Sequence, residues 1–354
     1  MSILFAILLF SVLIFIHELG HFVAAKLSGV QVNEFAIFMG PALWKKQIGE
    51  TLYAIRLIPI GGYCAMEGED GGSDNPRSFD KAVWWKKLII LVAGAAMNFI
   101  IGVMLMVIVY LPVNHEIAVP VISSFEEFAT VDGENGLQLG DEIIEVDGEK
   151  IYVYADFSLI LSLNEGDTHD LVVLRDGKKV VLDDFLMEKH EVTFEDGTTG
   201  KLYGMNFSLY KMNFCDKILY GWNQSLDTVR LVRLSLQMLF SGQAGLSDMT
   251  GPVGIVTQMS EVAEASETRM DALLNLLYFG GFIAINLAVM NLLPIPALDG
   301  GRIVGVLITT AVEAVTGKKI NPKYEGYLHA AGMLLLLGLM AVIMFKDIFV
   351  LFKG

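Results

Sequence analysis

Four apolar stretches, each close to the length of a membrane span, constrain the fold of this 354-residue chain more than any other feature. A helix of about 17–25 mostly apolar residues crosses the roughly 30 Å of hydrocarbon in a bilayer. The stretches cover residues 3–25, 88–111, 273–295 and 328–345, and the second and third contain no charged residue. The pattern predicts an α-helical multi-pass membrane protein with four transmembrane helices.

The composition agrees with a membrane protein and narrows the class of partner. Hydrophobic residues make up 54% of the chain and charged residues 18%, whereas soluble globular proteins are about 25% charged. The mean hydropathy is +0.54. Two Cys are too few for a disulfide scaffold. The net charge of −15 argues against a nucleic-acid partner, because phosphate recognition needs a basic surface. The composition therefore predicts the lipid bilayer as a partner.

An acidic, polar segment interrupts the apolar frame. Residues 112–272 contain 28 Asp and Glu but only 11 Lys and Arg, and the rest of the chain is nearly neutral. Within this segment, residues 217–240 have an apolar face but also carry Asp227, Arg230 and Arg233, so we expect them to lie in the membrane interface. The predicted organisation is a membrane domain over 1–111, a soluble domain over 112–210, an interfacial helix and linker over 211–260, and a second membrane part over 261–354.

Basic residues indicate the orientation in the membrane. They gather in the loop between the first two spans and in the loop before the last span, at Lys45, Lys46, Arg56, Arg77, Lys81, Lys86, Lys318, Lys319 and Lys323. Because cytoplasmic loops carry the excess of Lys and Arg, we expect both loops inside and both termini and the acidic insert outside. Cys64 and Cys215 then lie on opposite sides as free thiols. The first stretch is too long for a cleavable signal peptide and is expected to be retained.

The first apolar stretch contains the motif H-E-x-x-H at residues 17–21. Positions i and i+4 lie on one face of a helix, so His17 and His21 can reach one metal ion. Glu18 between them is placed to take a proton from a water molecule on that metal. The alternative is a set of satisfied polar side chains at a helix end. Each ionisable residue at the centre of a membrane helix costs about 2.5–3.5 kcal/mol on insertion scales, which favours the metal site.

A third ligand is needed, because catalytic zinc sites usually have three protein ligands and an open position. The candidate is Asp299, within the run N-L-L-P-I-P-A-L-D-G-G that begins at Asn291. Pro294 and Pro296 interrupt the helix, and irregular backbone at membrane depth is tolerated only where it is buried in protein or lines a cavity. The alternative is that Asp299 caps a short helix over 300–315. Because the H-E-x-x-H motif supplies only two of the three ligands, the metal-ligand role of Asp299 is favoured over the capping role.

The pairing of these two motifs resembles the site-2 proteases, and more closely the bacterial regulator-of-sigma-E type of intramembrane zinc metalloprotease. Other runs that are similar to segments of the family are residues 53–69, 77–80, 94–99, 136–148 and 251–255. The run 53–69 resembles a membrane-associated β-hairpin loop, and 136–148 the core of a PDZ domain. Ala65 and Ala95 depart from the residues common in the family, and neither is a metal ligand. The resemblance implies four transmembrane helices, a β-hairpin loop and an inserted extracytoplasmic PDZ-like α+β domain.

The resemblance also implies a reaction and a location. His17, His21 and Asp299 would hold one Zn²⁺ per chain, and Glu18 would activate the attacking water. The protein would lie in the bacterial cytoplasmic (inner) membrane with its active site toward the cytoplasm. Its substrates would be single-span membrane proteins, such as anti-sigma factors or remnant signal peptides. Another protease would trim them first, because the PDZ-like domain would exclude bulky outer domains.

Substrate contacts are expected beside the metal. A helical substrate must be drawn out as a strand before cleavage, and the resemblance implies pairing with a sheet edge within residues 52–66. The alternative is an ordinary cytoplasmic hairpin. The expected substrate-binding residues are Asn286, Asn291, Gly61, Gly62, Pro294 and Pro296. For the two Asn the alternative is hydrogen bonding between helices.

Two other functions fit parts of the sequence. A catalytically inactive membrane adaptor that displays a PDZ-like domain would bind no metal and would be indifferent to the loss of Glu18. A transporter would have broken helices in two related halves. The chain has one broken segment and no internal repeat, so the transporter is the weakest of the three hypotheses.

Overall fold

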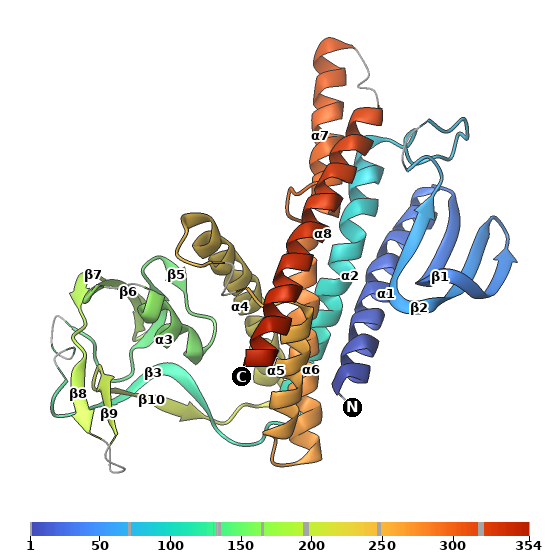
Figure 1. Cartoon of the computed structure of the whole chain (residues 1–354). Helices are drawn as coiled ribbons and strands as arrows, with labels where there is room; N and C mark the ends of the chain where they lie inside the picture. The colour runs from blue at the N-terminus through green and yellow to red at the C-terminus, as the bar shows by residue number, and fades with distance from the viewer. Residues whose placement is uncertain are drawn as a thin grey trace. The chain divides into compact units, whose positions relative to one another are not determined.

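The computed structural model describes residues 2–69, 72–129, 131, 133, 136–163, 166–193, 198–245, 249–317 and 322–353. The chain divides into two compact units (Figure 1). The first unit comprises Met1–Met106 with Thr228–Gly354, and the second comprises Val107–Asp227. Lys318 and Lys319, on which part of the predicted orientation rests, lie outside the described residues.

Long apolar helices form the frame of the first unit. The helices α1 (Ser2–Ser28), α2 (Trp84–Tyr110), α6 (Arg269–Asn291) and α8 (Pro322–Lys353) each contain a stretch long and apolar enough to cross a membrane. These stretches are Ala6–Ser28, Trp84–Tyr110, Arg269–Asn291 and Gly326–Phe349, with mean hydropathies between 1.9 and 2.5. The four predicted spans are thus confirmed as helices of the required length and hydropathy.

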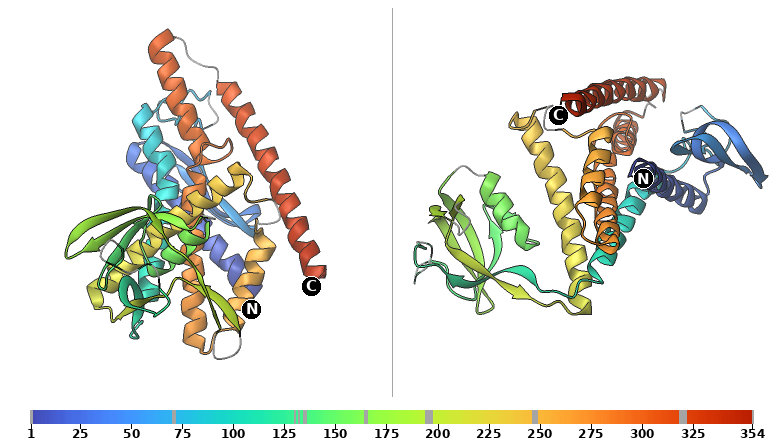
Figure 2. Two further views of the ribbon diagram at one scale, coloured as in Figure 1. Left: turned by 90° about the vertical axis from the view of Figure 1, so that its left-hand side faces the viewer. Right: turned by 60° about the horizontal axis from the view of Figure 1, so that its bottom comes forward.

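Small residues bring α1, α2 and α6 into close contact. A Cβ atom on Gly20 of α1 would come within 2.4 Å of the carbonyl oxygen of Ala93 in α2. A Cβ on Gly102 of α2 would lie 3.1 Å from the carbonyl oxygen of Gly281 in α6. Lipid tails are as apolar as the side chains of these helices, so the hydrophobic effect does not drive membrane helices together. They associate instead through close packing of this kind. Figure 2 shows the three helices side by side.

Three further helices are α4 (Phe214–Ser241), α5 (Pro252–Glu264) and α7 (Asp299–Thr316). The stretch predicted to lie in the interface is helical, as α4, and its side chains of Asp227 and Arg230 are buried. The N-cap of α7 is Leu298, and no side chain caps this helix. The alternative in which Asp299 caps the helix is therefore wrong, since Asp299 is already its first residue.

The predicted β-hairpin loop is present as β1 (Val32–Ile48) and β2 (Thr51–Met66), and both strands fold back on themselves. Residues 32–37 pair with 62–66 and also with 52–55, and residues 42–48 pair with 51–56. The order across the sheet is therefore 42–48, 51–56, 32–37 and 62–66. Phe38, Gly40 and Gly61 have φ values of 71°, 85° and 78°, which allow the tight corners. The segment 62–66 is an edge, with no further strand paired to it among the described residues.

The second unit is built on an antiparallel sheet with one short helix. Its strands are β3 (Ile117–Phe125), β4 (Glu142–Val146), β5 (Glu149–Lys150), β6 (Thr168–Arg175), β7 (Lys178–Leu186), β8 (His190–Thr193), β9 (Thr199–Leu202) and β10 (Met205–Tyr210). The main sheet has the order β10-β3-β4-β6-β7, with β5 beside β4, while β8 and β9 form a separate hairpin. The helix α3 (Tyr154–Leu163) packs on this sheet through a buried apolar core. This sheet-rich region fits the α+β insert that the sequence predicts.

Candidate metal centre

The first two candidate ligands come from α1. The helix runs without a break through residues 17–21, so the imidazoles of His17 and His21 lie one turn apart on the same face. Their Nε2 atoms are 3.1 Å apart, and the rings stand edge to face with an interplanar angle of 86°. His21 is buried and His17 is half-buried. The local spacing of the motif thus delivers two nitrogen donors to one point.

The third candidate ligand comes from the far end of the chain. α6 ends at Asn291, and the prolines at 294 and 296 keep the following segment irregular until α7 starts at Asp299. The Oδ2 atom of Asp299 lies 3.2 Å from Nε2 of His17 and 3.3 Å from Nε2 of His21. Among the described residues, these three form the one group of His, Cys, Asp or Glu whose donor atoms lie within 4.8 Å of one another.

The donor atoms have the geometry that zinc requires. Three ligands at about 2.0–2.1 Å from a tetrahedral Zn²⁺ lie about 3.3 Å apart, and the edges here are 3.1, 3.2 and 3.3 Å. Oδ2 of Asp299 is buried and has no hydrogen-bond partner of acceptable geometry. Burying such an oxygen is unfavourable unless another group compensates it. The residues present therefore fit a Zn²⁺ ion as three of its four ligands.

Groups behind the imidazoles hold them in orientation. The Nδ1–H of His21 donates to the carbonyl oxygen of Ile90 in α2, at 2.8 Å. Nδ1 of His17 faces the amides of Asn98 and Asn291, at 3.5 and 3.4 Å. Oδ1 of Asn98 is buried without a partner, and turning that amide by 180° places Oδ1 opposite the Nδ1–H of His17. Such partners set the tautomer and leave Nε2 free to bind a metal.

The sequence indicated Gly94 and Asn98 only as part of a family-like run, without a role. In the structure, a Cβ on Gly94 would lie 2.4 Å from Nε2 of His21 and 2.7 Å from Cε1 of His17. Only a glycine lets α2 approach the two rings this closely. The signal that would have found this face is the spacing of four residues between Gly94 and Asn98, because both then point toward α1.

Glu18 lies between the metal ligands and the edge of the β1–β2 sheet. Its carboxylate lies against the backbone of Cys64. A Cβ on Gly62 would lie 3.8 Å from Cγ of Glu18 and 3.0 Å from the carbonyl oxygen of Ala36. The free edge 62–66 thus runs past the Glu18 carboxylate, and Gly62 leaves that approach open.

The remaining predicted substrate contacts lie in α6, in the segment that follows it and at a corner of the sheet. Asn286 is half-buried in α6, Pro294 is exposed, and Pro296 is half-buried. Asn291 is half-buried, and its amide faces Nδ1 of His17. Gly61 lies at a corner of the sheet, next to the edge segment.

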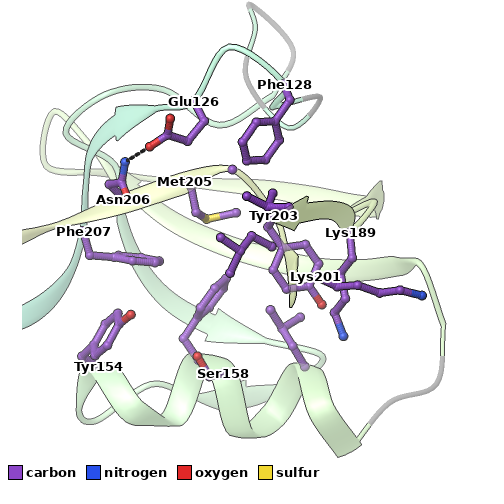
Figure 3. Close-up of a pocket in the computed structure, with 15 residues that line it drawn as sticks. Glu126, Phe128, Tyr154, Ser158, Lys189, Lys201, Tyr203, Met205, Asn206 and Phe207 are labelled. Carbon is purple, nitrogen blue, oxygen red and sulfur yellow. Dashed lines mark hydrogen bonds between the residues drawn. The ribbon is translucent and has the colours of Figure 1, made fainter. Parts of the chain in front are cut away.

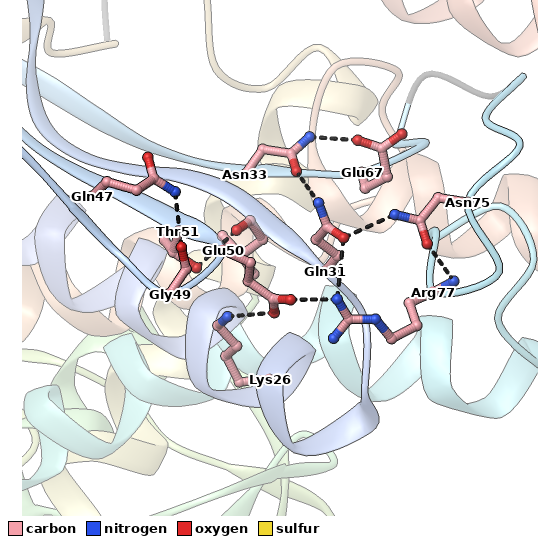
Figure 4. Close-up of polar contacts among 11 residues, drawn as sticks. Lys26, Gln31, Asn33, Gln47, Gly49, Glu50, Thr51, Glu67, Asn75 and Arg77 are labelled. Atoms are coloured by element: carbon pink, nitrogen blue, oxygen red, sulfur yellow. Dashed lines mark hydrogen bonds and ion pairs between the residues drawn. The ribbon is translucent and has the colours of Figure 1, made fainter.

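Ionic contacts fix the sheet against the end of α1 (Figure 4). Glu50, at the turn between β1 and β2, accepts from Lys26 of α1 at 2.7 Å and also pairs with Arg77. These hydrogen bonds hold the pKa of the Glu50 carboxyl below its usual range. On the other side, Arg302 of α7 pairs with Glu69, which follows β2. The sheet edge, α1 and the helix of Asp299 are thereby tied together.

A groove in the second unit is a separate candidate binding site. It has a volume of about 600 Å³ and lies between α3 and the edge strand β10. Figure 3 shows Tyr154 and Phe207 at one end and Lys189 with Lys201 at the other. The two cations are notable because the surrounding segment is strongly acidic.

Comparisons with known proteins agree with the geometry. The model of peptidase family M50 matches residues 5–339. A protein of Clostridium acetobutylicum, provisionally named a zinc metalloprotease, is 36% identical, with 98% of this chain and 97% of the relative covered. The regulator of sigma-W protease RasP of Bacillus subtilis is 27% identical, with 97% of each chain covered. With its four membrane helices, the chain belongs to peptidase family M50 and is a membrane zinc metalloprotease of the site-2 protease type.

Proposed function

We propose that this chain is an endopeptidase that hydrolyses peptide bonds within single-span membrane proteins, with one Zn²⁺ held by His17, His21 and Asp299. The observation that supports this assignment most strongly is the triangle of donor atoms, with edges of 3.1–3.3 Å. Glu18 is the general base. It is the ionisable group adjacent to both this triangle and the sheet edge.

Zn²⁺, when bound, supplies Lewis acidity that makes a water molecule a competent nucleophile near neutral pH. The Glu18 carboxylate accepts the proton of that water and hands it to the nitrogen of the departing amine. His17 and His21 as neutral imidazoles and Asp299 as a carboxylate would together bring a single negative charge, which would leave a bound Zn²⁺ with a net positive charge. Asn98 and the Ile90 carbonyl hold the imidazoles in place during these proton transfers.

The edge segment 62–66 is the site at which an extended substrate adds to the sheet. A peptide in helical form keeps its carbonyls hydrogen-bonded, whereas a strand paired with an edge offers them to a nucleophile. The position of Gly62 beside Glu18 supports this pairing. The amide of Asn291 lies beside Nδ1 of His17 and donates to a substrate carbonyl, and Asn286, Gly61, Pro294 and Pro296 contact the substrate further along.

The second unit is the substrate filter, with a PDZ-like arrangement of α3 beside the edge strand β10. It lies outside the cytoplasm together with both termini, and the protein resides in the bacterial inner membrane with its active site toward the cytoplasm. Substrates reach the metal after another protease has removed bulky outer domains. Membrane-bound anti-sigma factors are a substrate class, by analogy with the relative named a regulator of sigma-W protease.

The test compares the purified full-length protein with Glu18→Gln and His17→Ala. We expect about one zinc per wild-type chain, cleavage of a single-span substrate, normal zinc but no cleavage for Glu18→Gln, and lost zinc for His17→Ala. Elemental analysis and electrophoresis of the products measure the two properties. Zinc-free protein that still cleaves, or unchanged cleavage by Glu18→Gln, would contradict the proposal. A wild-type protein that neither binds zinc nor cleaves would favour the inactive adaptor.

A further inference from the structure

Near its N-terminal end, α8 contacts the segment that leads to Asp299. The backbone N–H of Ala297 donates to Nδ1 of His329, at 3.0 Å. One turn further along, Gly332 packs against Pro296, and a Cβ there would lie 2.4 Å from the Pro296 carbonyl oxygen. His329 and Gly332 thus hold the two residues that precede Leu298 and the candidate ligand.

The segment held in this way is strained. Ala297 has a φ of 85°, in the left-handed region that residues other than glycine rarely adopt. Such a conformation persists only where surrounding contacts impose it, and strain of this kind gathers at functional sites. The hydrogen bond to His329 is a contact that imposes it, because it fixes the direction of the Ala297 N–H.

A second anchor holds the other end of α8. The buried carboxylate of Asp347 accepts from the N–H groups of Gly251 and Gly254, at 3.0 and 2.9 Å, at the start of α5. The two anchors are 18 residues apart, about 27 Å along a helix. Only 6% of the most apolar part of α8, within Gly326–Phe349, is buried. Figure 2 shows the helix at the outside of the first unit. The helix is therefore held mainly at its ends.

We propose that His329 is a positioning residue for the metal centre: by accepting the N–H of Ala297 it sets the turn that aims the Asp299 carboxylate at the two imidazoles. This inference rests on the ligand set proposed above. It makes α8, which contributes no ligand, part of the metal site. The relevant property of His329 is an acceptor atom at the Nδ1 position.

Two matched variants isolate that acceptor. In His329→Asn, the side-chain oxygen occupies nearly the place of Nδ1 and still accepts the bond. In His329→Gln, the added methylene carries the oxygen past that place. Asp347→Ala serves as the control, since it breaks the other anchor of the same helix and leaves the Ala297 contact intact.

The experiment titrates purified full-length protein with a zinc chelator and follows retained zinc by elemental analysis, with thermal unfolding measured alongside. Changing a group that orients a metal ligand lowers metal affinity about 10–100-fold, and we expect that loss for His329→Gln. We expect His329→Asn and Asp347→Ala to stay within about threefold of the wild type, well short of that loss. Equal affinity in all four proteins, or equal loss in all three variants, would overturn the role of His329. A wild type that binds no zinc would instead overturn the proposed function.

Discussion

Gly94→Ala offers the sharpest test of how α2 supports the metal centre. The added Cβ would lie 2.4 Å from Nε2 of His21, whereas ordinary van der Waals contact begins at 3.4 Å. The imidazole or the helix must therefore move by about 1 Å, and a misplacement of that size costs about 10²-fold in rate. This factor corresponds to about 2.7 kcal/mol of transition-state stabilisation. Overpacking adds about 1–3 kcal/mol of destabilisation of the folded chain.

The matched control is Gly338→Ala in α8. It is the same change in another apolar helix, but nothing lies within 4 Å of the added Cβ. We expect normal zinc content and cleavage for Gly338→Ala, and for Gly94→Ala reduced zinc with a loss of at least about 10²-fold in kcat/KM. Elemental analysis and the cleavage rate of a single-span substrate in detergent measure both effects. Normal zinc and a normal rate in Gly94→Ala would refute the close approach of α2 to the imidazoles.

Three further predictions concern other parts of the chain. Arg175→Met should destabilise the second unit by about 3–5 kcal/mol, measured by chemical unfolding, because the fully buried Asp141 carboxylate loses its charged partner; an unchanged midpoint would contradict this. Since ion pairing lowers the pKa of Glu50 in the folded state, it stabilises the sheet above the ordinary pKa of a Glu carboxyl, and that contribution is lost as the pH falls through the lowered value. Hydrogen exchange should show less acid sensitivity of the sheet in Glu50→Gln, and equal sensitivity would argue against the role of this contact. Burial raises the pKa of the Cys64 thiol, so iodoacetamide at pH 8 should modify the exposed Cys215 and spare Cys64. Mass spectrometry of the labelled protein measures this, and modification of Cys64 in preference to Cys215 would contradict it.

Much of the architecture was accessible from the sequence, because it depends on local properties. The four spans follow from runs of apolar side chains, and the pairing of His17 with His21 follows from the period of the helix. The break before Asp299 follows from two prolines. The metal-ligand interpretation of Asp299 also depended on the H-E-x-x-H motif, which supplies only two of three ligands. Without that motif, the sequence around Asp299 predicts a helix cap as readily as a metal ligand.

The supporting contacts were not accessible in the same way. Gly94 and Asn98 act on imidazoles in another helix, and the fold of β1 and β2 into four paired segments depends on which edges meet. The contact between His329 and Ala297 joins two segments whose separate patterns indicate only a membrane helix and a loop. No local period encodes such pairings.

The sequence by itself determined that the chain is a membrane protein with four apolar stretches long enough to cross a bilayer, and that His17, Glu18 and His21 lie within the first of them. Only the tertiary structure decided that two nitrogens of α1 and one oxygen of α7 form a triangle with edges of 3.1–3.3 Å. Spacing along a helix places side chains on a face, but a metal ion requires donors placed to within a few tenths of an ångström. That accuracy arises from the packing of α2 against α1, and from the contacts that hold the segment before α7.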